Sequence, residues 1–479
     1  MKLQSIHLRH AHHFADLNIR FNATQKPISL ILGQQSSGKT VILKNIYQAL
    51  TWFPARFKDN RTAGVVMLDS DIMQHRVQSK IEVQVRFPSE IGSLAESTTS
   101  EEKDVSVCAW KLYKTLNSNG VGFSKVDTQQ LEQMAKLYNQ ALAQDPFIGL
   151  PMIAYYPTDR FVNEMNLISK NNPGVFQQHS AYELAALPYT TFARFFEWFR
   201  EVSDIENAQT AQLFQQILQQ SKQQDAAPNG ADTSHNAQQD PSADDTSETT
   251  FKDSSLSQSL FQAQAQLHTP SLNALKTALN TVFPEFSDLY LEYQPKLQLM
   301  VVYQGQTMPF SQLSNSIRNW VALVGDIVRR MCLLNPKSLF PCMEGDGILL
   351  IDNIDAQLDQ DMTQNVLPRL HQAFPNVQII ATGTSEDLLE HATHYQYFRL
   401  EHQSLEEIDL EANQMALDDL YQDLMSEVSA SELEQLTEPQ TALNKVETLF
   451  EQVQQLSDEQ QQALLKLMRG DDSHQSVKL

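Results

Sequence analysis

The stretch Gly33-Gln34-Gln35-Ser36-Ser37-Gly38-Lys39-Thr40 fits the pattern G-x-x-x-x-G-K-[ST] at every position. Before it, the apolar run Ile28–Leu32 predicts a buried strand, and behind it the apolar spacing over Val41–Leu50 predicts a helix. Strand, glycine loop and helix are the context in which this pattern forms a phosphate-binding loop, or P-loop. We therefore predict an α/β fold that binds a nucleoside triphosphate.

The motif assigns a role to each of its residues. Backbone N–H groups of the loop and the positive end of the following helix would face the phosphates. Lys39 would reach the β- and γ-phosphates, and the Thr40 hydroxyl would ligate Mg²⁺. The alternative is a nucleotide fold that no longer binds, but intact Lys39 and Thr40 favour binding. The expected nucleotide contacts here are Gly33, Ser36, Ser37, Gly38, Lys39, Thr40 and Val41.

A second half of the site is predicted where the apolar run Gly347–Ile351 ends in Asp352. In P-loop ATPases an aspartate in this place holds Mg²⁺ through water; the alternative for Asp352 is a helix N-cap. The next residue, normally a glutamate that polarises the attacking water, is Asn353. Asparagine orients water but cannot accept its proton, and loss of a general base costs about 10²- to 10⁴-fold in rate. Earlier in the chain, Ser314 or Asn315 is predicted to cap the start of a helix that runs to Leu334. A phosphate could also bind at this capped start.

The composition describes an acidic chain of 479 residues, with 35 Lys and Arg against 58 Asp and Glu, a net charge of −23. This balance argues against general polyanion binding, DNA included, although a local basic groove could exist. Its three cysteines show no metal or disulfide spacing. Because the N-terminus has no apolar signal core and no run reaches the length of a membrane span, we expect a soluble, cytoplasmic protein with no membrane partner.

Histidines gather in Arg9-His10-Ala11-His12-His13-Phe14, between two predicted strands at Lys2–His7 and Leu17–Phe21. They invite a metal hypothesis. No carboxylate or cysteine completes a recognisable ligand spacing, so we expect instead a loop over the edge of the nucleotide site.

Together these segments resemble the ABC-type ATPases of the RecF/SMC-like class. More specifically, they look like a bacterial family of predicted ATP-binding proteins involved in virulence, whose relatives occur in anti-phage defence operons. The resemblance covers most of residues 1–400. It rests on the P-loop followed by Ala49–Phe53, and on the segments Leu150–Pro157, Phe195–Glu201, Ala322–Arg330, Glu344–Asp352 and Phe374–Gln378.

The resemblance implies a P-loop NTPase with a mixed central sheet, divided along the chain as follows. Residues 1–88 would form the N-terminal lobe with the P-loop, 89–218 a family-specific, mostly helical insertion, and 219–257 a disordered linker, whose polar composition cannot bury a core. Residues 258–400 would form the second lobe, and 401–479 an acidic helical extension.

The family also implies a head-to-tail dimer, in which ATP lies between one subunit's P-loop and the other's signature helix. The family's signature Leu-Ser-Asp-Gly is Leu313-Ser314-Asn315-Ser316 here, and its Thr-His-Ser switch is Gly383-Thr384-Ser385. Ser314 and Ser316 are therefore expected nucleotide contacts, and Asn353 and Thr384 occupy degenerate catalytic positions. The changes touch hydrolysis and spare the binding loop, which implies ATP and Mg²⁺ binding with impaired hydrolysis.

Three functional hypotheses follow. The first is a nucleotide-gated scaffold or sensor, a homodimer or higher oligomer that holds an effector such as a nuclease or a second ATPase subunit. The second is a slow, genuine ATPase coupled to DNA handling or anti-phage defence, in which Asp355 or Gln357 replaces the missing glutamate. The third is a structural subunit with a vestigial site.

Overall fold

The structure is a computed structural model that describes residues 1–94, 106–162, 178–182, 192–225 and 270–409. The chain divides into a unit at Met1–Glu406 and a second at Glu407–Leu479. The acidic extension therefore lies almost wholly outside the described residues, as does most of the expected linker. The described residues of the expected extension, 401–409, include strand β14 (Ser404–Ile408).

A six-stranded sheet forms the centre of the first unit, in the order β14-β13-β3-β12-β11-β7. Strands β13, β3, β12, β11 and β7 run parallel. Every residue of β3, β11 and β12 is buried, because parallel strands covered on both faces read as continuous apolar runs. The bounds are β3 Ile28–Leu32, β7 Met152–Tyr156, β11 Gly347–Ile351, β12 Val377–Gly383 and β13 Tyr395–Glu401.

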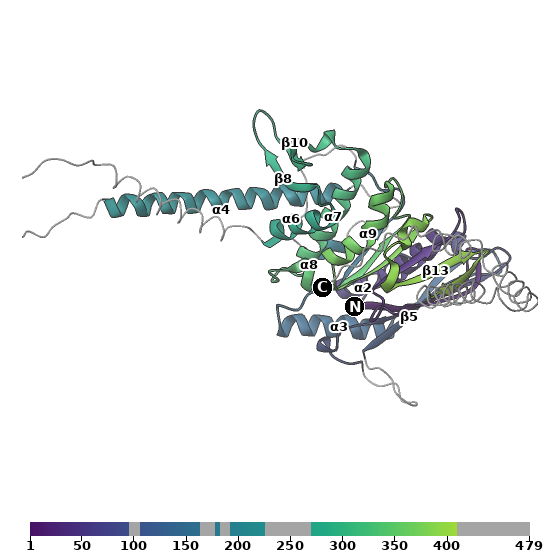
Figure 1. Cartoon of the computed structure of the whole chain (residues 1–479). Coiled ribbons are helices and arrows are strands. Elements are labelled where there is room, and N and C mark those ends of the chain that lie inside the picture. The colour runs from purple at the N-terminus through teal and green to yellow at the C-terminus, as the bar shows by residue number, and fades with distance from the viewer. Residues whose placement is uncertain (95–105, 163–177, 183–191, 226–269, 410–479) are drawn as a thin grey trace, which may run out of the picture. The chain divides into compact units, whose positions relative to one another are not determined.

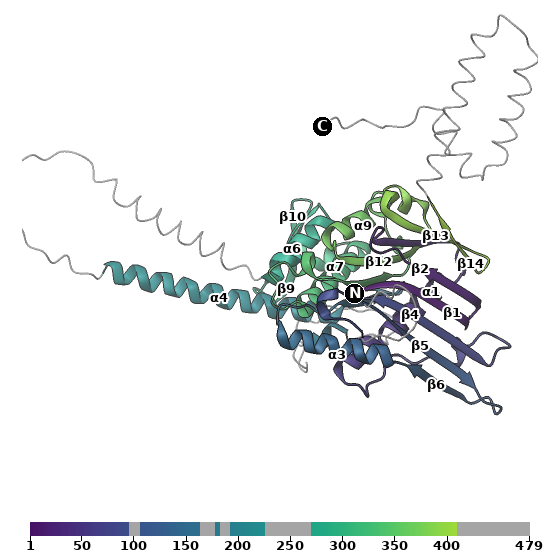
Figure 2. The same ribbon diagram turned by 90° about the horizontal axis from the view of Figure 1, so that it is seen from below.

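A second, antiparallel sheet has the order β2-β1-β4-β5-β6. Its central strands β4 and β5 alternate buried residues with half-buried or exposed ones, the period expected when one face packs on a core and the other faces solvent. Figure 2 shows β4 and β5 side by side in this sheet, and α3 (Gln129–Gln144) lies close to β5 in both Figure 1 and Figure 2. The strands are β1 Lys2–Ala11, β2 Phe14–Arg20, β4 Gln78–Arg86, β5 Val107–Leu116 and β6 Gly122–Asp127.

Helices and a small third sheet complete the first unit. Helix α1 (Lys39–Leu50) packs on β7 and β11, while α7 (Asn315–Leu334) packs on β7 and on α6 (Pro270–Val282). The small sheet has the order β10-β9-β8. The remaining elements are α2 Trp52–Lys58, α4 Ala193–Asp225, β8 Phe286–Glu292, β9 Gln298–Tyr303, β10 Gln306–Pro309, α8 Pro341–Glu344 and α9 Gln360–Ala373.

The structure adds detail to two parts of the expected division. The stretch 89–218 contains strands beside its helices α3 and α4, since β5 and β6 extend the antiparallel sheet and β7 pairs with β11. Helix α4 continues to Asp225, past the expected start of the linker at 219, because its first turns are anchored by a buried cluster of Phe195, Phe196, Trp198 and Phe199. The division into lobes itself stays a prediction. Among the described residues, no helix is both long enough and apolar enough to cross a membrane.

Candidate nucleotide site

The P-loop runs from the end of β3 into α1, and two of its residues have left-handed backbone. Ser36 has φ 65° and Gly38 has φ 109°. A Cβ atom at position 38 would lie 2.1 Å from His13 Nε2, so both the conformation and the space require glycine there. The histidine segment does lie beside the P-loop, but it is a two-residue turn rather than a loop, because β1 continues to Ala11 and β2 begins at Phe14.

Lys39 folds back over the loop that precedes it. Its ammonium donates to the carbonyl oxygens of Gly33 and Gln34, the second at 2.8 Å, and the residue is 5% exposed. Burial lowers the pKa of Lys39, while the carboxylates of Asp355 and Asp352 act to raise it. An ammonium has three donors, so the two carbonyls leave one for a phosphate oxygen.

Asp352 is fully buried at the end of β11 and collects three hydroxyl groups. Its Oδ2 accepts from Thr40 Oγ1 at 2.8 Å and from Thr158 Oγ1 at 2.9 Å, and its Oδ1 accepts from Thr382 Oγ1 at 2.7 Å. Carboxylate and hydroxyl oxygens are ligands that suit Mg²⁺, so the residues present fit that ion. Asp352 does not cap a helix: α9 is capped by Asp359, which accepts from the backbone N–H of Met362 at 2.9 Å.

The turn at Asn353 is held from both sides. Arg160 donates to the carbonyl oxygens of Asp352 at 2.6 Å and Asn353 at 2.8 Å, and its guanidinium lies 5.6 Å from the ring centre of Trp320 in α7. Burial lowers the pKa of Arg160 to about 10. The Asn353 N–H donates to Thr382 Oγ1 at 2.9 Å, and its φ of 45° is a conformation that asparagine tolerates well.

The switch segment is tied to the same turn through Asp355. One oxygen of this residue, Oδ2, accepts from the Thr384 N–H, the Thr384 hydroxyl and the Ser385 N–H, each at 2.8 Å. Thr384 therefore lies at the site through a neighbouring carboxylate, and Asp355 links the turn after β11 to the end of β12.

The signature serines lie at the start of α7. Ser314 caps the helix by accepting from the Ile317 N–H at 3.3 Å, and Ser316 Oγ donates to the carbonyl oxygen of Gln357 at 2.5 Å. In the described part of this single chain, their hydrogen bonds go to α7 and to the loop after β11, and none joins them to the P-loop. Their contact with a nucleotide stays a prediction that requires a second subunit.

Three residues that sequence reasoning missed contribute to the arrangement: Thr158, Arg160 and Thr382. A signal for two of them existed, because Thr158 and Thr382 lie near the carboxyl ends of β7 and β12, where ligands of parallel sheets gather. For Arg160 the sequence holds no comparable signal, since its contacts depend on how distant segments pack.

Comparison with known proteins places the chain in a family. An AAA domain model matches residues 5–284, which include the P-loop, Thr158 and Arg160. A retron Ec83 probable ATPase of Escherichia coli is 25% identical over 399 residues, covering 80% of this chain and 69% of that protein. A retron Vc95 probable ATPase of Vibrio cholerae serotype O1 biovar El Tor is 24% identical over 408 residues, covering 82% of this chain and 72% of that protein.

A solved structure of an Smc head domain with an extended coiled coil, bound to the C-terminal domain of ScpA from Pyrococcus furiosus, aligns with 88% of this chain and 99% of its own. Its TM-score is 0.44 and its sequence identity is 11%. The AAA domain match covers more than half of the chain and includes its phosphate-binding loop. The chain therefore belongs to this AAA-domain family of P-loop ATPases, as the sequence resemblance indicated.

Proposed function

We propose that this chain binds ATP with Mg²⁺ and uses the bound nucleotide to gate an assembly with a partner effector, while hydrolysing ATP poorly. The observation that carries the proposal is the meeting of Lys39, Thr40 and Asp352 in one cradle directly beside Asn353. The groups that bind a nucleotide are together, and the group that would activate water is absent from its usual place.

The binding half of the proposal rests on fit. The Thr40 hydroxyl and the Asp352 carboxylate are 2.8 Å apart, close enough to ligate one ion directly and through water. When bound, Mg²⁺ would neutralise part of the negative charge of the triphosphate. Ser37 Oγ is buried without a hydrogen-bond partner among the described residues, which suits a loop that receives a phosphate oxygen.

Impaired hydrolysis follows from what remains near Asn353. The amide orients water but cannot take its proton. The neighbouring carboxylate of Asp355 is engaged, because its Oδ2 already accepts three hydrogen bonds from the switch segment. Only Oδ1 of Asp355 is then left to accept a proton from water. Asp355 also lies two residues beyond Asn353, the position where the glutamate is normally found.

A gate needs ATP to bind one assembly state better than another, and it needs no turnover. The exposed start of α7, with Ser314, is where the family resemblance expects a second subunit's nucleotide. Two relatives are named as retron probable ATPases, and the resemblance extends to anti-phage defence operons. Both support an assembly in which this chain works beside a partner effector in such a defence system.

The test measures binding, turnover and mass on the full chain. Binding of a fluorescent ATP analogue with Mg²⁺ should be tight in the wild type, and Lys39→Ala should weaken it by about 10- to 100-fold through loss of a charge-assisted hydrogen bond. Lys44→Ala, an exposed lysine of the same helix, is the matched control and should bind normally. Light scattering should show a larger particle with ATP than with ADP.

Two results would reject the proposal. Turnover near about one per second, within the usual enzyme range and abolished in Lys39→Ala, would mean a working ATPase. Absence of any Lys39-dependent nucleotide binding would leave a structural subunit with a vestigial site.

A slow, genuine ATPase is the second candidate function, and one observation favours it. Asp355 adjoins both the switch segment and the charge of Lys39. If its carboxylate activates water, Asp355→Asn should abolish whatever turnover the wild type shows, while Gln357→Ala should not.

A further inference from the structure

The antiparallel sheet carries a surface that the nucleotide site does not use. We call it the outer sheet face: the side chains of β2, β1, β4, β5 and β6 that point away from the buried side. Residues directly paired across strands share a face, and the register aligns Arg9 with Lys80, Lys80 with Tyr113 and Tyr113 with Lys125. The opposite side holds Ile81, Val83, Trp110 and Leu112, all at most 1% exposed. The row from Arg9 to Lys125 therefore faces outward.

Cations dominate the outer sheet face of a chain whose net charge is −23. It bears Arg9, Arg20, Lys80, Arg86, Lys111 and Lys125 against the carboxylates of Asp16, Glu82 and Asp127. Glu82 is shared by Lys80 at 2.6 Å and Lys111 at 3.4 Å, so one carboxylate serves two ammonium groups. In the described residues Lys125 has no ion pair. The surplus of positive charge on one face of an acidic chain favours a polyanionic ligand.

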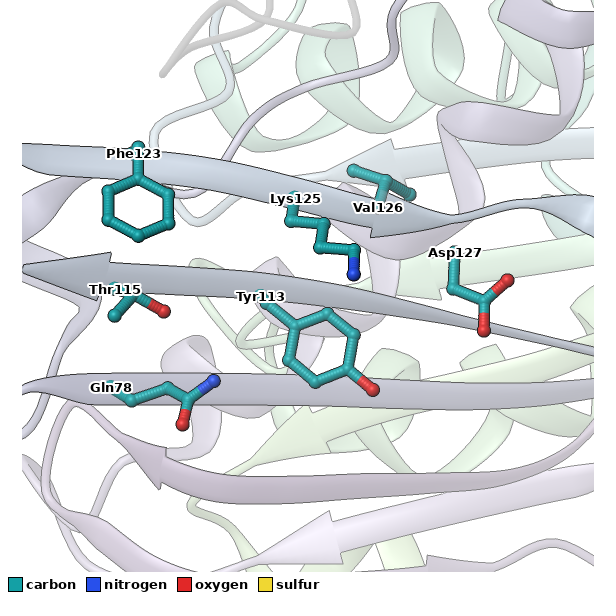
Figure 3. Close-up of a pocket in the computed structure, with 7 residues that line it drawn as sticks. All are labelled: Gln78, Tyr113, Thr115, Phe123, Lys125, Val126 and Asp127. Carbon is teal, nitrogen blue, oxygen red and sulfur yellow. The ribbon is translucent and has the colours of Figure 1, made fainter.

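Aromatic side chains lie among these charged residues on the outer sheet face. A hollow of about 570 Å³ crosses β4, β5 and β6, and Figure 3 shows Tyr113 and Phe123 in it with Lys125. Phe123 is 54% exposed, an unusual state for a phenylalanine on a strand. The other lining residues are Gln78, Thr115 and Asp127, which supply amide, hydroxyl and carboxylate groups for hydrogen bonds, and the apolar Val126.

We propose that the outer sheet face binds a single-stranded nucleic acid, with phosphates along the row from Arg9 to Lys125 and bases stacked on Tyr113 and Phe123. Accessible rings on a sheet with cationic neighbours are the combination that single strands use, because every base has a face to stack. A duplex keeps its bases stacked on one another and offers the rings no face. The site is separate from the P-loop, so this inference goes beyond the proposed function and does not depend on it.

The test is fluorescence anisotropy of a labelled 20-nucleotide oligo(dT) and oligo(U) with the full chain at low salt. Wild type should bind both, and prefer them to a duplex of mixed sequence and equal length. Tyr113→Ala and Phe123→Ala should each weaken binding by about tenfold, a typical loss for one stacked base. Lys125→Glu should also reduce the slope of log affinity against log salt by roughly 0.7, the value for one phosphate on a single strand.

Two control variants change residues of the same types away from the outer sheet face. Phe147→Ala removes a phenylalanine that is 75% exposed, and Lys136→Glu reverses an exposed lysine of α3; both should bind like wild type. Circular dichroism melting of each variant separates lost binding from lost folding, and a well-folded Tyr113→Ser can replace a poorly folded Tyr113→Ala.

Several outcomes would overturn the inference. These are no oligonucleotide binding by wild type, equal or tighter binding of the duplex, or equal weakening by Lys136→Glu. Binding to phosphatidylserine vesicles with no binding to oligonucleotide would assign the face to a membrane instead. Because Lys39→Ala should leave oligonucleotide binding unchanged, failure here and failure of the nucleotide proposal are distinguishable.

Discussion

The P-loop half of the candidate site and the half built by α7, Asn353 and the switch segment differ in what they have kept. In the first, Lys39 and Thr40 are the residue types that the P-loop motif requires, and both interact with Asp352. In the second, the frame is intact: Arg160 holds the turn at Asn353, and Asp355 ties it to Thr384. What differs is the reactive group, because an amide stands where an acid is expected.

The difference separates two demands on one fold. Binding a nucleotide needs backbone N–H groups, one ammonium and a metal ligand, whereas hydrolysis adds a proton acceptor placed within about 3 Å of a water. The same fold can therefore bind a nucleotide, and couple that binding to a change elsewhere in the protein, without the proton acceptor that hydrolysis requires. The following measurements challenge that comparison.

The largest expected effect concerns the frame of the second half. In the middle of α7, the Asp326 carboxylate accepts from Arg329 at 2.9 Å, from Arg330 at 2.8 Å and from the Tyr156 hydroxyl at 2.9 Å, all buried. Asp326→Asn leaves two buried guanidinium groups without a counter-charge and should lower the free energy of unfolding by about 3–5 kcal/mol. Urea denaturation measures this.

The same carboxylate predicts a pH dependence. Although burial opposes it, Arg330 and Arg329 hold the pKa of Asp326 well below its usual range. A depressed folded-state pKa contributes stability above the unfolded value, about 3.9, and that contribution is lost as the pH falls below it. The gap in stability between wild type and Asp326→Asn should therefore narrow below about pH 4. Glu201→Gln, on an exposed position of α4, should show neither effect.

The next largest effect restores the missing acid. Asn353→Glu should raise ATP turnover by about 100-fold, the lower end of what a general base supplies. The left-handed backbone at this residue costs glutamate about 1 kcal/mol more than asparagine, which limits the gain. Phosphate release at saturating ATP is the measurement. Asn353→Gln has the same size without a basic carboxylate, and equal rates in the two variants would show that position 353 does not face the water.

A smaller effect is expected where Thr158 meets Asp352. Thr158→Val keeps the shape of the side chain and removes one hydrogen bond to Oδ2, worth about 1 kcal/mol. The Mg²⁺ concentration that supports half-maximal ATP binding should therefore shift by about fivefold. The same change at Thr277, exposed on α6, serves as control. An unchanged Mg²⁺ requirement in Thr158→Val would show that the hydrogen bond from Thr158 to Asp352 does not affect metal binding.

The smallest effect distinguishes the two candidate functions. Under the gated scaffold, Asp355→Asn should change residual turnover by less than about twofold, because asparagine can still accept hydrogen bonds from Thr384 and Ser385. A loss of tenfold or more, read in the same phosphate-release assay, would identify Asp355 as a working base and favour the slow ATPase.

Sequence reasoning located the buried strands of the central sheet well. The predicted strands at Ile28–Leu32 and Gly347–Ile351 coincide with β3 and β11, because a fully buried parallel strand leaves an uninterrupted apolar run. It could not give the strand order. Strand β7 pairs with β11 from almost two hundred positions earlier in the chain, and no local pattern encodes that partner.

For the site, local motifs predicted Lys39, Thr40 and Asp352, and the structure brings the last two to 2.8 Å. Groups that act through packing were missed. Arg160 donates to two carbonyl oxygens at the end of β11, and these contacts exist only once distant elements meet. A tertiary contact of this kind leaves no periodicity or motif spacing in the sequence from which it could be predicted.

The closeness of His13 to Gly38 has a mechanical meaning. The turn between β1 and β2 rests on the loop that would wrap the phosphates, and the same two strands carry Arg9 and Arg20 on their far side. This contact is a direct structural route between the outer sheet face and the P-loop. By thermodynamic reciprocity, any change in nucleotide affinity caused by a ligand on the outer sheet face would be matched by an equal change in that ligand's affinity when the nucleotide binds.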